Sequence, residues 1–413
     1  MLFPYFFFLL YFPLTNQLDP SNEYYKNISE NDIFSKHYSK AKEMIKNMTL
    51  EEKLGQLFIV RYNKDKVKEY IMNYHFGGFT LYKTDFNNHQ TTKSIYDELE
   101  SIKNLSKIKL AFAVDEEGGT VSRLSKFRKN PFDSPQNYFK KGGFDLVIKN
   151  ELEKINIMKE CNLNLNFAPV ADYTENTTKY IYERTLGGTI KETQEFIEKF
   201  VRNYNKNKMT CSLKHFPGYG NNIDTHKDIA YDDRDLESFK KLDFLPFISG
   251  IKNLVPQIMV GHLILKKIDE KYPASLSGKI HKILREDLKY SGLILTDDLS
   301  MEGIKKYISN NSATSIAISS GVDIVLTSDP EKHYNQTLND VKNGIINNNT
   351  IDNAVLRVLS WKLEFLENND NNNVIFIIII IFAVVFLIGC AVYFLVFKKN
   401  KITQSDLEAS LTI

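Results

Sequence analysis

Short apolar runs alternate with longer amphipathic segments along most of the chain. Eight runs rich in branched and aromatic residues each end in Gly, Pro, His or Asp, which is the strand signal. Their almost continuous apolar character is typical of parallel strands that are covered on both faces. The runs cover residues 56–62, 76–83, 109–115, 163–172, 209–215, 257–265, 292–297 and 322–327. They predict an α/β fold built as a single (β/α)8 TIM-type barrel.

The segments between the runs are rich in Lys, Glu and Leu and predict helices. These cover residues 66–74, 92–105, 145–161, 190–206, 238–251, 277–288 and 312–319, and a last helix covers 351–366. Thr49 and Glu52 match a capping box, so a helix is expected to begin there. A doubly wound sheet is the alternative fold. It would normally place a Gly-rich turn after the first strand, and residues 61–64 (Arg-Tyr-Asn-Lys) contain no glycine.

The two ends of the chain carry apolar runs that indicate a membrane. Residues 1–14 match the core of a signal peptide, so 1–18 are a candidate signal peptide, with an uncleaved anchor as the alternative. Residues 374–397 contain no charge and, at about 1.5 Å per residue, would cross a hydrocarbon core of about 30 Å. Lysines follow directly, which places the tail 398–413 in the cytoplasm.

These ends predict a single-pass type I membrane protein. The barrel, residues 40–367, would then face the outside of the cell or the lumen of an endolysosomal vesicle. Seven N-x-S/T sequons agree with that side and predict a glycoprotein; they begin at Asn27, Asn47, Asn104, Asn176, Asn310, Asn335 and Asn348.

Composition excludes some function classes and leaves others open. The 413 residues carry a formal net charge of +2, so no charge excess indicates a nucleic-acid partner. Three cysteines do not make a disulfide framework. Cys390 lies in the apolar tail, and Cys161 and Cys211 are either buried thiols or one disulfide.

Polar residues follow most of the predicted strands. In a (β/α)8 barrel the active site lies where strands end and the following loops begin. The charged or histidine residues at these positions are Asp115, Glu117, Asp172, Lys214, His215, His262, Asp297, Asp298 and Asp329. We therefore expect them to face one rim of the barrel, although charged strand ends also serve as plain solubilising groups.

Asp297 is the candidate nucleophile. It ends an apolar strand, which aims a carboxylate rigidly. Asp298 is adjacent and should point to the opposite face, so only one of the two is expected to attack. The alternatives are two structural carboxylates, or the substrate-assisted route of some hexosaminidases.

Residues 214–226 read KHFPGYGNNIDTH and leave a strand for a loop rich in Gly and Asn. Asp224 lies two residues before His226, a spacing that favours a proton shuttle, because only His has an unperturbed pKa near neutrality. An ordinary polar surface loop is the alternative interpretation. No serine lies in a nucleophile elbow, which disfavours acyl transfer. No His-x-His ends the first strand, and no HExxH or Cys cluster occurs, so neither a metal nor a cofactor is expected.

Several segments together resemble the glycoside hydrolase family 3 β-N-acetylhexosaminidases of the NagZ type. They are 48–56 (MTLEEKLGQ), 114–123 (VDEEGGTVSR), 166–172 (NFAPVAD), 183–185 (ERT), 214–226 and 295–303 (LTDDLSMEG), and the resemblance runs from about 40 to 366. It implies a retaining exo-glycosidase that removes terminal, non-reducing β-linked N-acetylglucosamine. It also implies a glycosyl-enzyme intermediate on Asp297, with His226 as acid/base and Asp224 orienting it. The positions implied to bind the sugar are Asp115, Arg123, Arg184, Lys214 and His215.

Two positions depart from the family motif. Tyr219 stands where the motif usually has a second histidine, and Thr225 stands in place of the commoner serine. Neither change removes a catalytic group. The alternatives are a family 3 β-glucosidase or phosphorylase, or a non-catalytic membrane-tethered glycan receptor. Family 3 β-glucosidases draw their acid/base from outside this loop, so the intact Asp224-x-His226 favours a hexosaminidase acting on peptidoglycan fragments, chitooligosaccharides or glycoprotein glycans.

Overall fold

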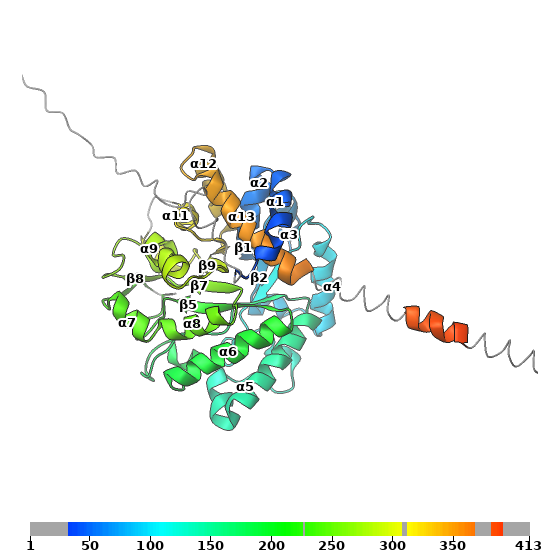
Figure 1. Cartoon of the computed structure of the whole chain (residues 1–413), viewed down its shortest axis with the longest axis horizontal. Coiled ribbons are helices and arrows are strands. Elements are labelled where there is room, and N and C mark those ends of the chain that lie inside the picture. The colour runs from blue at the N-terminus through cyan, green and yellow to red at the C-terminus, as the bar shows by residue number, and fades with distance from the viewer. Residues whose placement is uncertain (1–31, 226–227, 308–311, 368–380, 391–413) are drawn as a thin grey trace, which may run out of the picture. The chain divides into compact units, whose positions relative to one another are not determined.

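The computed structural model describes residues 32–225, 228–307, 312–367 and 381–390. The chain divides into two units, Met1–Leu366 and Glu367–Ile413. The first unit contains the sheet and almost all of the helices (Figure 1).

One eight-stranded sheet, with all neighbouring strands parallel, forms the centre of the first unit. Its order is β10-β1-β2-β3-β4-β5-β7-β9. A parallel bridge between Leu295 and Ile324 joins β9 to the segment before β10, so the sheet curls into a nearly closed barrel. The strands are β1 (Phe58–Arg61), β2 (Gly78–Leu81), β3 (Ala111–Val114), β4 (Leu165–Asn166), β5 (Thr210–Phe216), β7 (Gln257–Val260), β9 (Leu293–Thr296) and β10 (Val325–Thr327). Each overlaps one predicted run, which confirms the barrel.

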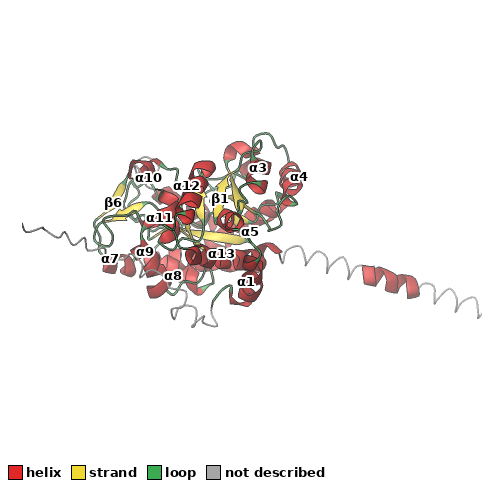
Figure 2. Cartoon of the chain, turned by 90° about the horizontal axis from the view of Figure 1, so that it is seen from above, coloured by secondary structure: helices red, strands yellow, loops and turns green. Residues whose placement is uncertain are grey.

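Helices surround the strands, as Figure 2 shows with helices in red and strands in yellow. Thr49 caps α2 as predicted: its hydroxyl accepts from the Glu52 backbone at 3.1 Å, and the Glu52 carboxylate accepts from the Thr49 backbone at 2.8 Å. The helices are α1 (Tyr38–Lys46), α2 (Leu50–Gln56), α3 (Val67–Met72), α4 (Thr92–Lys103), α5 (Pro135–Glu160), α6 (Ile190–Lys206), α7 (Leu236–Lys241), α8 (Phe244–Lys252), α9 (Gly278–Lys282), α10 (Glu302–Tyr307), α11 (Ala313–Ser319), α12 (Pro330–Lys342) and α13 (Asn348–Lys362).

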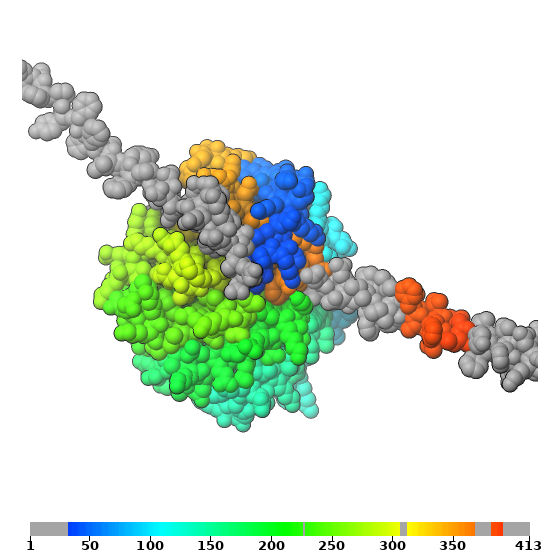
Figure 3. All heavy atoms as spheres, in the orientation of Figure 1, coloured from blue at the N-terminus to red at the C-terminus, as the bar shows by residue number. Residues whose placement is uncertain are grey.

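The first and last helices of this unit pack against each other. Figure 3 shows α1 and α2 in blue beside α13 in orange, in agreement with the contacts between α1 and α13. Trp361 of α13 is fully buried, and its indole Nε1 donates to the Thr210 hydroxyl on β5 at 3.1 Å. Helix α13 is thereby hydrogen-bonded to β5, the barrel strand that carries Lys214 and His215.

A second, two-stranded parallel ribbon was not predicted. It pairs β6 (Ala230–Asp232) with β8 (Leu263–Leu265). The predicted run 257–265 is divided into β7 and β8 at Gly261 and His262. β6 escaped prediction because it has only three residues and its central Tyr231 is exposed.

The predicted membrane-spanning helix is wrong. Within the described residues, the structure has no helix that is both long and apolar enough to cross a bilayer. Of the predicted span 374–397, the structure describes residues 381–390, which are helical. The predicted single-pass type I topology and the predicted membrane partner are therefore wrong as well. The candidate signal peptide 1–18 and the tail 398–413 lie outside the described residues.

Cys161 and Cys211 are both buried free thiols, so they form no disulfide with each other. Burial raises the pKa of the Cys161 thiol to about 12, which keeps it protonated and unreactive at neutral pH.

Candidate active site

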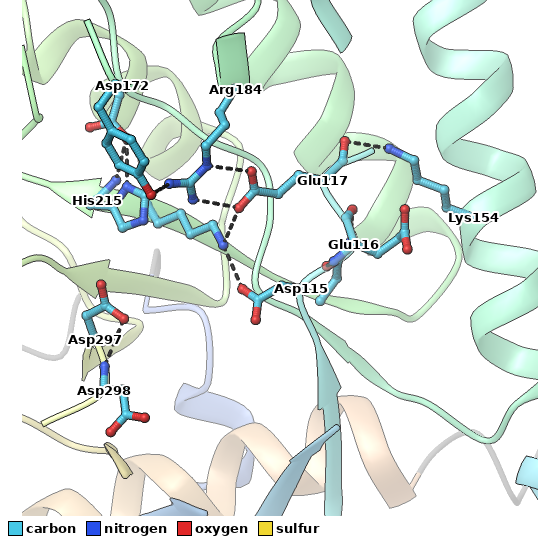
Figure 4. A network of polar contacts seen from close by, with 12 residues as sticks. Asp115, Glu116, Glu117, Lys154, Asp172, Arg184, His215, Asp297 and Asp298 are labelled. Carbon is cyan, nitrogen blue, oxygen red and sulfur yellow. Dashed lines mark hydrogen bonds and ion pairs between the residues drawn. The ribbon is translucent and has the colours of Figure 1, made fainter. Parts of the chain in front are cut away.

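The residues expected at the strand ends come together at one end of the barrel. Asp115 follows β3, Lys214 and His215 lie in β5, and Asp297 follows β9. Figure 4 shows Asp115, His215 and Asp297 grouped at this end although three different strands present them. Because these strands are parallel, their carboxyl ends share one rim, as the sequence predicted.

A buried ion cluster centred on Glu117 joins three of the predicted sugar-binding residues. Arg184, in the 3₁₀ turn Tyr182–Arg184, donates from Nε to Glu117 Oε2 at 2.9 Å and from Nη2 to Oε1 at 2.8 Å. Lys214 Nζ lies 2.6 Å from Glu117 Oε1 and 2.7 Å from Asp115 Oδ1 (Figure 4). The two cations and two carboxylates balance, so the cluster is neutral and its donors are fixed in place.

The pKa values in the cluster reflect this mutual compensation. Burial alone would raise the pKa of Glu117, but Arg184 and Lys214 outweigh it and hold that pKa well below its usual range. Burial alone would lower the pKa of Lys214, but Asp115 and Glu117 raise it. Glu117 and Lys214 are therefore both charged at neutral pH.

The turn that carries Glu117 is fixed from behind. Gly118 has a φ of 92°, and a Cβ there would lie 2.4 Å from the Asp133 carbonyl, so only glycine fits. Lys154 of α5 is fully buried and donates to the Glu117 carbonyl at 2.8 Å and to Glu151 at 2.7 Å. The sequence predicted Glu117 only as one of the charged residues that follow the strands. The structure adds that its side chain is the centre of the ion cluster.

Arg123 ends the same turn. Its backbone N–H donates to the buried Glu116 carboxylate at 2.8 Å. Its side-chain Nε is buried and has no hydrogen-bond partner among the described residues. A buried donor left unpaired costs about 1–3 kcal/mol, so this N–H is suited to meet an acceptor on a ligand.

His215 is held by Asp172. The Asp172 Oδ2 atom accepts from His215 Nδ1 at 2.8 Å and from the His215 backbone at 3.1 Å. Its Oδ1 atom accepts from the Tyr219 backbone at 2.7 Å. A carboxylate against Nδ1 fixes the proton there and sets the ring orientation.

The neighbours Asp297 and Asp298 have different environments. The Asp297 backbone donates to the Val260 carbonyl at 3.0 Å, and its Oδ1 atom accepts from the Asp298 backbone at 2.8 Å. The Asp298 carboxylate accepts from the Ser300 backbone at 2.8 Å and from the Ser328 backbone at 3.1 Å. Asp298 therefore anchors the two strand ends β9 and β10, while Asp297 is held at the rim with 9% of its surface exposed.

Tyr180 packs on the loop after β5, with its ring centroid 5.9 Å from that of Tyr219. Burial raises the pKa of Tyr180. Arg184 opposes this, and the carboxylates of Asp224, Glu117 and Asp297 add to it. Arg184 Nη1 also donates to the Tyr180 hydroxyl at 2.8 Å. Tyr180 lies in an irregular loop, so no sequence pattern pointed to it.

The predicted acid/base His226 lies outside the described residues. The segment before it is described as far as Thr225. Asn222 donates to the Asp232 carboxylate of β6 at 2.7 Å, and Arg234 braces Asp232 and Asp243. The short ribbon β6–β8 therefore supports the loop that carries Asp224.

His262, one of the residues predicted at the strand ends, is hydrogen-bonded to protein groups at both ring nitrogens. Nδ1 lies 2.8 Å from the Ser275 hydroxyl, and Nε2 lies 3.0 Å from the Asp298 carbonyl. Across the described part of the chain, no group of three His, Cys, Asp or Glu residues is arranged to hold a metal.

Comparison with known proteins identifies the family of this chain. Residues 49–361 match the glycosyl hydrolase family 3 N-terminal domain. The chain belongs to glycosyl hydrolase family 3. The resemblance of its motifs to the NagZ-type β-N-acetylhexosaminidases is thereby confirmed, as is its place among glycoside hydrolases.

Curated relatives of this family 3 chain carry the name beta-hexosaminidase. It is 29% identical over 288 residues to "Beta-hexosaminidase A" of Pseudoalteromonas piscicida, covering 63% of this chain and 47% of the relative. It is 32% identical over 230 residues to the "Beta-hexosaminidase" of Idiomarina loihiensis, covering 52% of this chain and 66% of the relative. The chain thus spans between about half and two thirds of the length of these relatives.

Among solved structures, a family 3 beta-N-acetylglucosaminidase from Paenibacillus sp. has the same fold. It superposes with a TM-score of 0.72 at 25% identity, covering 77% of this chain and 62% of that one.

Proposed function

We propose that this chain is a retaining exo-glycosidase that hydrolyses terminal, non-reducing β-linked N-acetylglucosamine. The observation that supports it most directly is the rim itself. A carboxylate at the end of β9 lies beside a neutral, preformed set of sugar-binding donors, in a family 3 chain whose relatives are named beta-hexosaminidase. The natural substrate would be a glycan that ends in this sugar, with no cofactor required.

Sugar binding is assigned to Asp115, Arg123, Arg184, Lys214 and His215. The Asp115 carboxylate keeps about a fifth of its side chain exposed and is suited to accept from vicinal hydroxyls. Lys214 and Arg184 offer charge-assisted donors that are already oriented, which reduces the entropy lost on binding. The unpaired Nε of Arg123 adds a donor for a carbonyl or hydroxyl oxygen.

The proposed chemistry is a double displacement. A carboxylate oxygen of Asp297 attacks the anomeric carbon, and the bond from that carbon to the leaving oxygen breaks through an oxocarbenium-like transition state. His226, oriented by Asp224, donates a proton to the leaving oxygen. It then removes a proton from water, which attacks the anomeric carbon and releases Asp297. The result is net retention at the anomeric carbon.

The test uses 4-nitrophenyl substrates with the purified full chain. We expect turnover of the β-N-acetylglucosaminide, weak or absent turnover of the β-glucoside, and no requirement for phosphate. Asp297→Ala should lower kcat by about a thousandfold or more. Asp65→Ala serves as the control, because Asp65 is an exposed carboxylate in the turn after β1.

Three results would each contradict the proposal. If Asp297→Ala turned over substrate at the wild-type rate, Asp297 would not be the nucleophile. Faster turnover of the β-glucoside, or turnover only with phosphate, would instead identify the β-glucosidase or phosphorylase alternative. Tight binding of N-acetylglucosamine glycans with no turnover by folded protein would identify a receptor.

A further inference from the structure

The two residues that depart from the family motif contact each other. The Tyr219 hydroxyl forms a short hydrogen bond with the Thr225 hydroxyl, and the Thr225 backbone N–H lies 3.4 Å from the same phenol oxygen. Both side chains are completely buried. Thr225 directly follows Asp224, so this contact holds the segment that leads into the proposed acid/base.

Tyr219 is also tied to the sugar-binding side of the rim. Its backbone N–H donates to Asp172 Oδ1 at 2.7 Å, and Asp172 Oδ2 holds the His215 ring at 2.8 Å. The rings of Tyr219 and His215 meet edge to face with centroids 5.1 Å apart. One side chain thus connects the fixed end of β5 with the end of the loop.

The loop between these points is held by side chains and not by a backbone ladder. Its described part, residues 217–225, contains no helix or strand, and both Gly218 and Gly220 have positive φ values. Asn222 donates to Asp232 at 2.7 Å, and Thr174 donates to Asn221 at 2.8 Å. An acid/base must lie within about 2.6–3.2 Å of the oxygen it protonates, and a misplacement of about 1 Å can cost about a hundredfold in rate.

We infer that Tyr219, through its hydroxyl bond to Thr225, is a positioning residue for Asp224, the carboxylate proposed to orient the acid/base. This inference rests on the proposed function and assigns to it a residue that does not touch the reacting atoms. The hydrogen-bonded pair Tyr219 and Thr225 would take the place of the histidine and serine that are usual at these positions of the motif.

The deciding measurement is the dependence of kcat/KM on the leaving group. kcat/KM reports the step that forms the glycosyl-enzyme, and a leaving group of low pKa departs without a proton from the enzyme. Tyr219→Phe keeps the ring on His215 and removes only the hydroxyl. We expect it to lower kcat/KM about tenfold or more on poor leaving groups, such as chitobiose, and by no more than about twofold on the 2,4-dinitrophenyl glycoside.

Two further variants test whether the hydroxyls act as a pair. Thr225→Val keeps the side-chain shape and should reproduce the leaving-group dependence of Tyr219→Phe. The double variant should be no worse than either single variant, because one lost bond cannot be lost twice. Exchange to the usual pair, Tyr219→His with Thr225→Ser, should recover more activity on chitobiose than Tyr219→His alone.

Tyr173→Phe is the matched control. Tyr173 is buried beside Asp172, but its hydroxyl donates to Glu175 at 2.7 Å and has no contact with Thr225. Removal of the Tyr173 hydroxyl should change kcat/KM by the same factor on both substrates. Equal losses on both substrates for Tyr219→Phe would overturn the inference and leave only a role in folding.

His226→Ala separates this inference from the proposed function. If His226→Ala shows the leaving-group dependence and Tyr219→Phe does not, the positioning role alone is wrong. If His226→Ala itself shows no such dependence, the proposed acid/base is wrong and the positioning role falls with it.

Discussion

Replacing Lys214 with methionine removes the cation that binds Asp115 and Glu117 and keeps an unbranched side chain. Lys214 Nζ lies 2.7 Å from Asp115 Oδ1 and 2.6 Å from Glu117 Oε1. Its side chain and that of Glu117 are almost completely buried. The variant therefore leaves two carboxylates in place with less positive charge beside them.

The expected loss of unfolding free energy depends on the contacts that remain in the variant. Breaking a buried ion pair by removing one partner typically costs about 3–5 kcal/mol. Glu117 keeps both hydrogen bonds from Arg184, and Asp115 is partly exposed and can bind water. The loss should therefore lie at the lower end, at about 3 kcal/mol of unfolding free energy at pH 7.

The pH dependence of this loss has a definite sign. The folded-state pKa of Glu117 lies below its ordinary value of 4.5, so its stabilisation is present above that value and is lost as the pH falls further. The pKa of Lys214 lies above 10.5, so its contribution is lost only at higher pH. The difference between wild type and Lys214→Met should be flat from about pH 5 to 10 and shrink below about 4.5.

Urea unfolding at several pH values measures this difference. Lys199→Met is the control, because Lys199 forms an exposed pair with Glu195 at 3.4 Å on α6 and should change stability by less than about 0.5 kcal/mol. A loss below about 1 kcal/mol for Lys214→Met at pH 7 would refute the buried cluster. So would a loss that grows below pH 4.5.

Three other variants test groups at the site and behind it. Burial raises the pKa of Asp243 to about 6 although Arg234 binds it. The unfolding free energy of wild type should therefore fall by about 3 kcal/mol relative to that of Asp243→Asn as the pH rises from 3.5 to 7, as measured by urea unfolding. Burial lowers the pKa of Lys362 to about 7. The unfolding free energy of wild type should therefore rise by about 3–5 kcal/mol relative to that of Lys362→Met as the pH rises from 7 to 10.5. No change in this difference would contradict the burial of the Lys362 amine. Gly218 has a φ of 120°, and a Cβ there would lie 2.7 Å from Asp243 Oδ1, so Gly218→Ala should cost about 2–3 kcal/mol by calorimetry. Gly344→Ala, with a φ of 73° and open space, should cost only about 1 kcal/mol, and equal losses would remove the argument from the close contact.

The barrel could be predicted because its strands are buried on both faces and so read as continuous apolar runs. The same property misplaced some strand ends. Within the run 163–172, the strand β4 covers only two residues, although Val170 forms a further parallel bridge with Lys214. The helix predicted over 145–161 is the second part of α5. A first part, which the sequence did not reveal, begins at Pro135 with Ser134 as its cap, and the non-helical backbone of Gly142 and Gly143 separates the two parts.

The candidate site was predictable at the strand ends and not between them. Asp115, Lys214 and Asp297 were found because a strand end fixes where a side chain lies. The bond between Glu117 and Arg184 joins residues 67 positions apart, and no local pattern reports such a contact.

The two halves of the site differ in how they are held, and this should separate the effects of mutations. The half proposed to bind the sugar is a neutral cluster built on strand ends and on two turns tied to them, so its donors are oriented before a substrate arrives. The half that carries Asp224 has no regular backbone structure and depends on side-chain contacts such as those of Tyr219 and Asn222. Changes in the first half should therefore lower stability and raise KM together. Changes in the second should alter the leaving-group dependence of kcat/KM with little loss of stability, because they remove orientation and leave the core of the barrel intact.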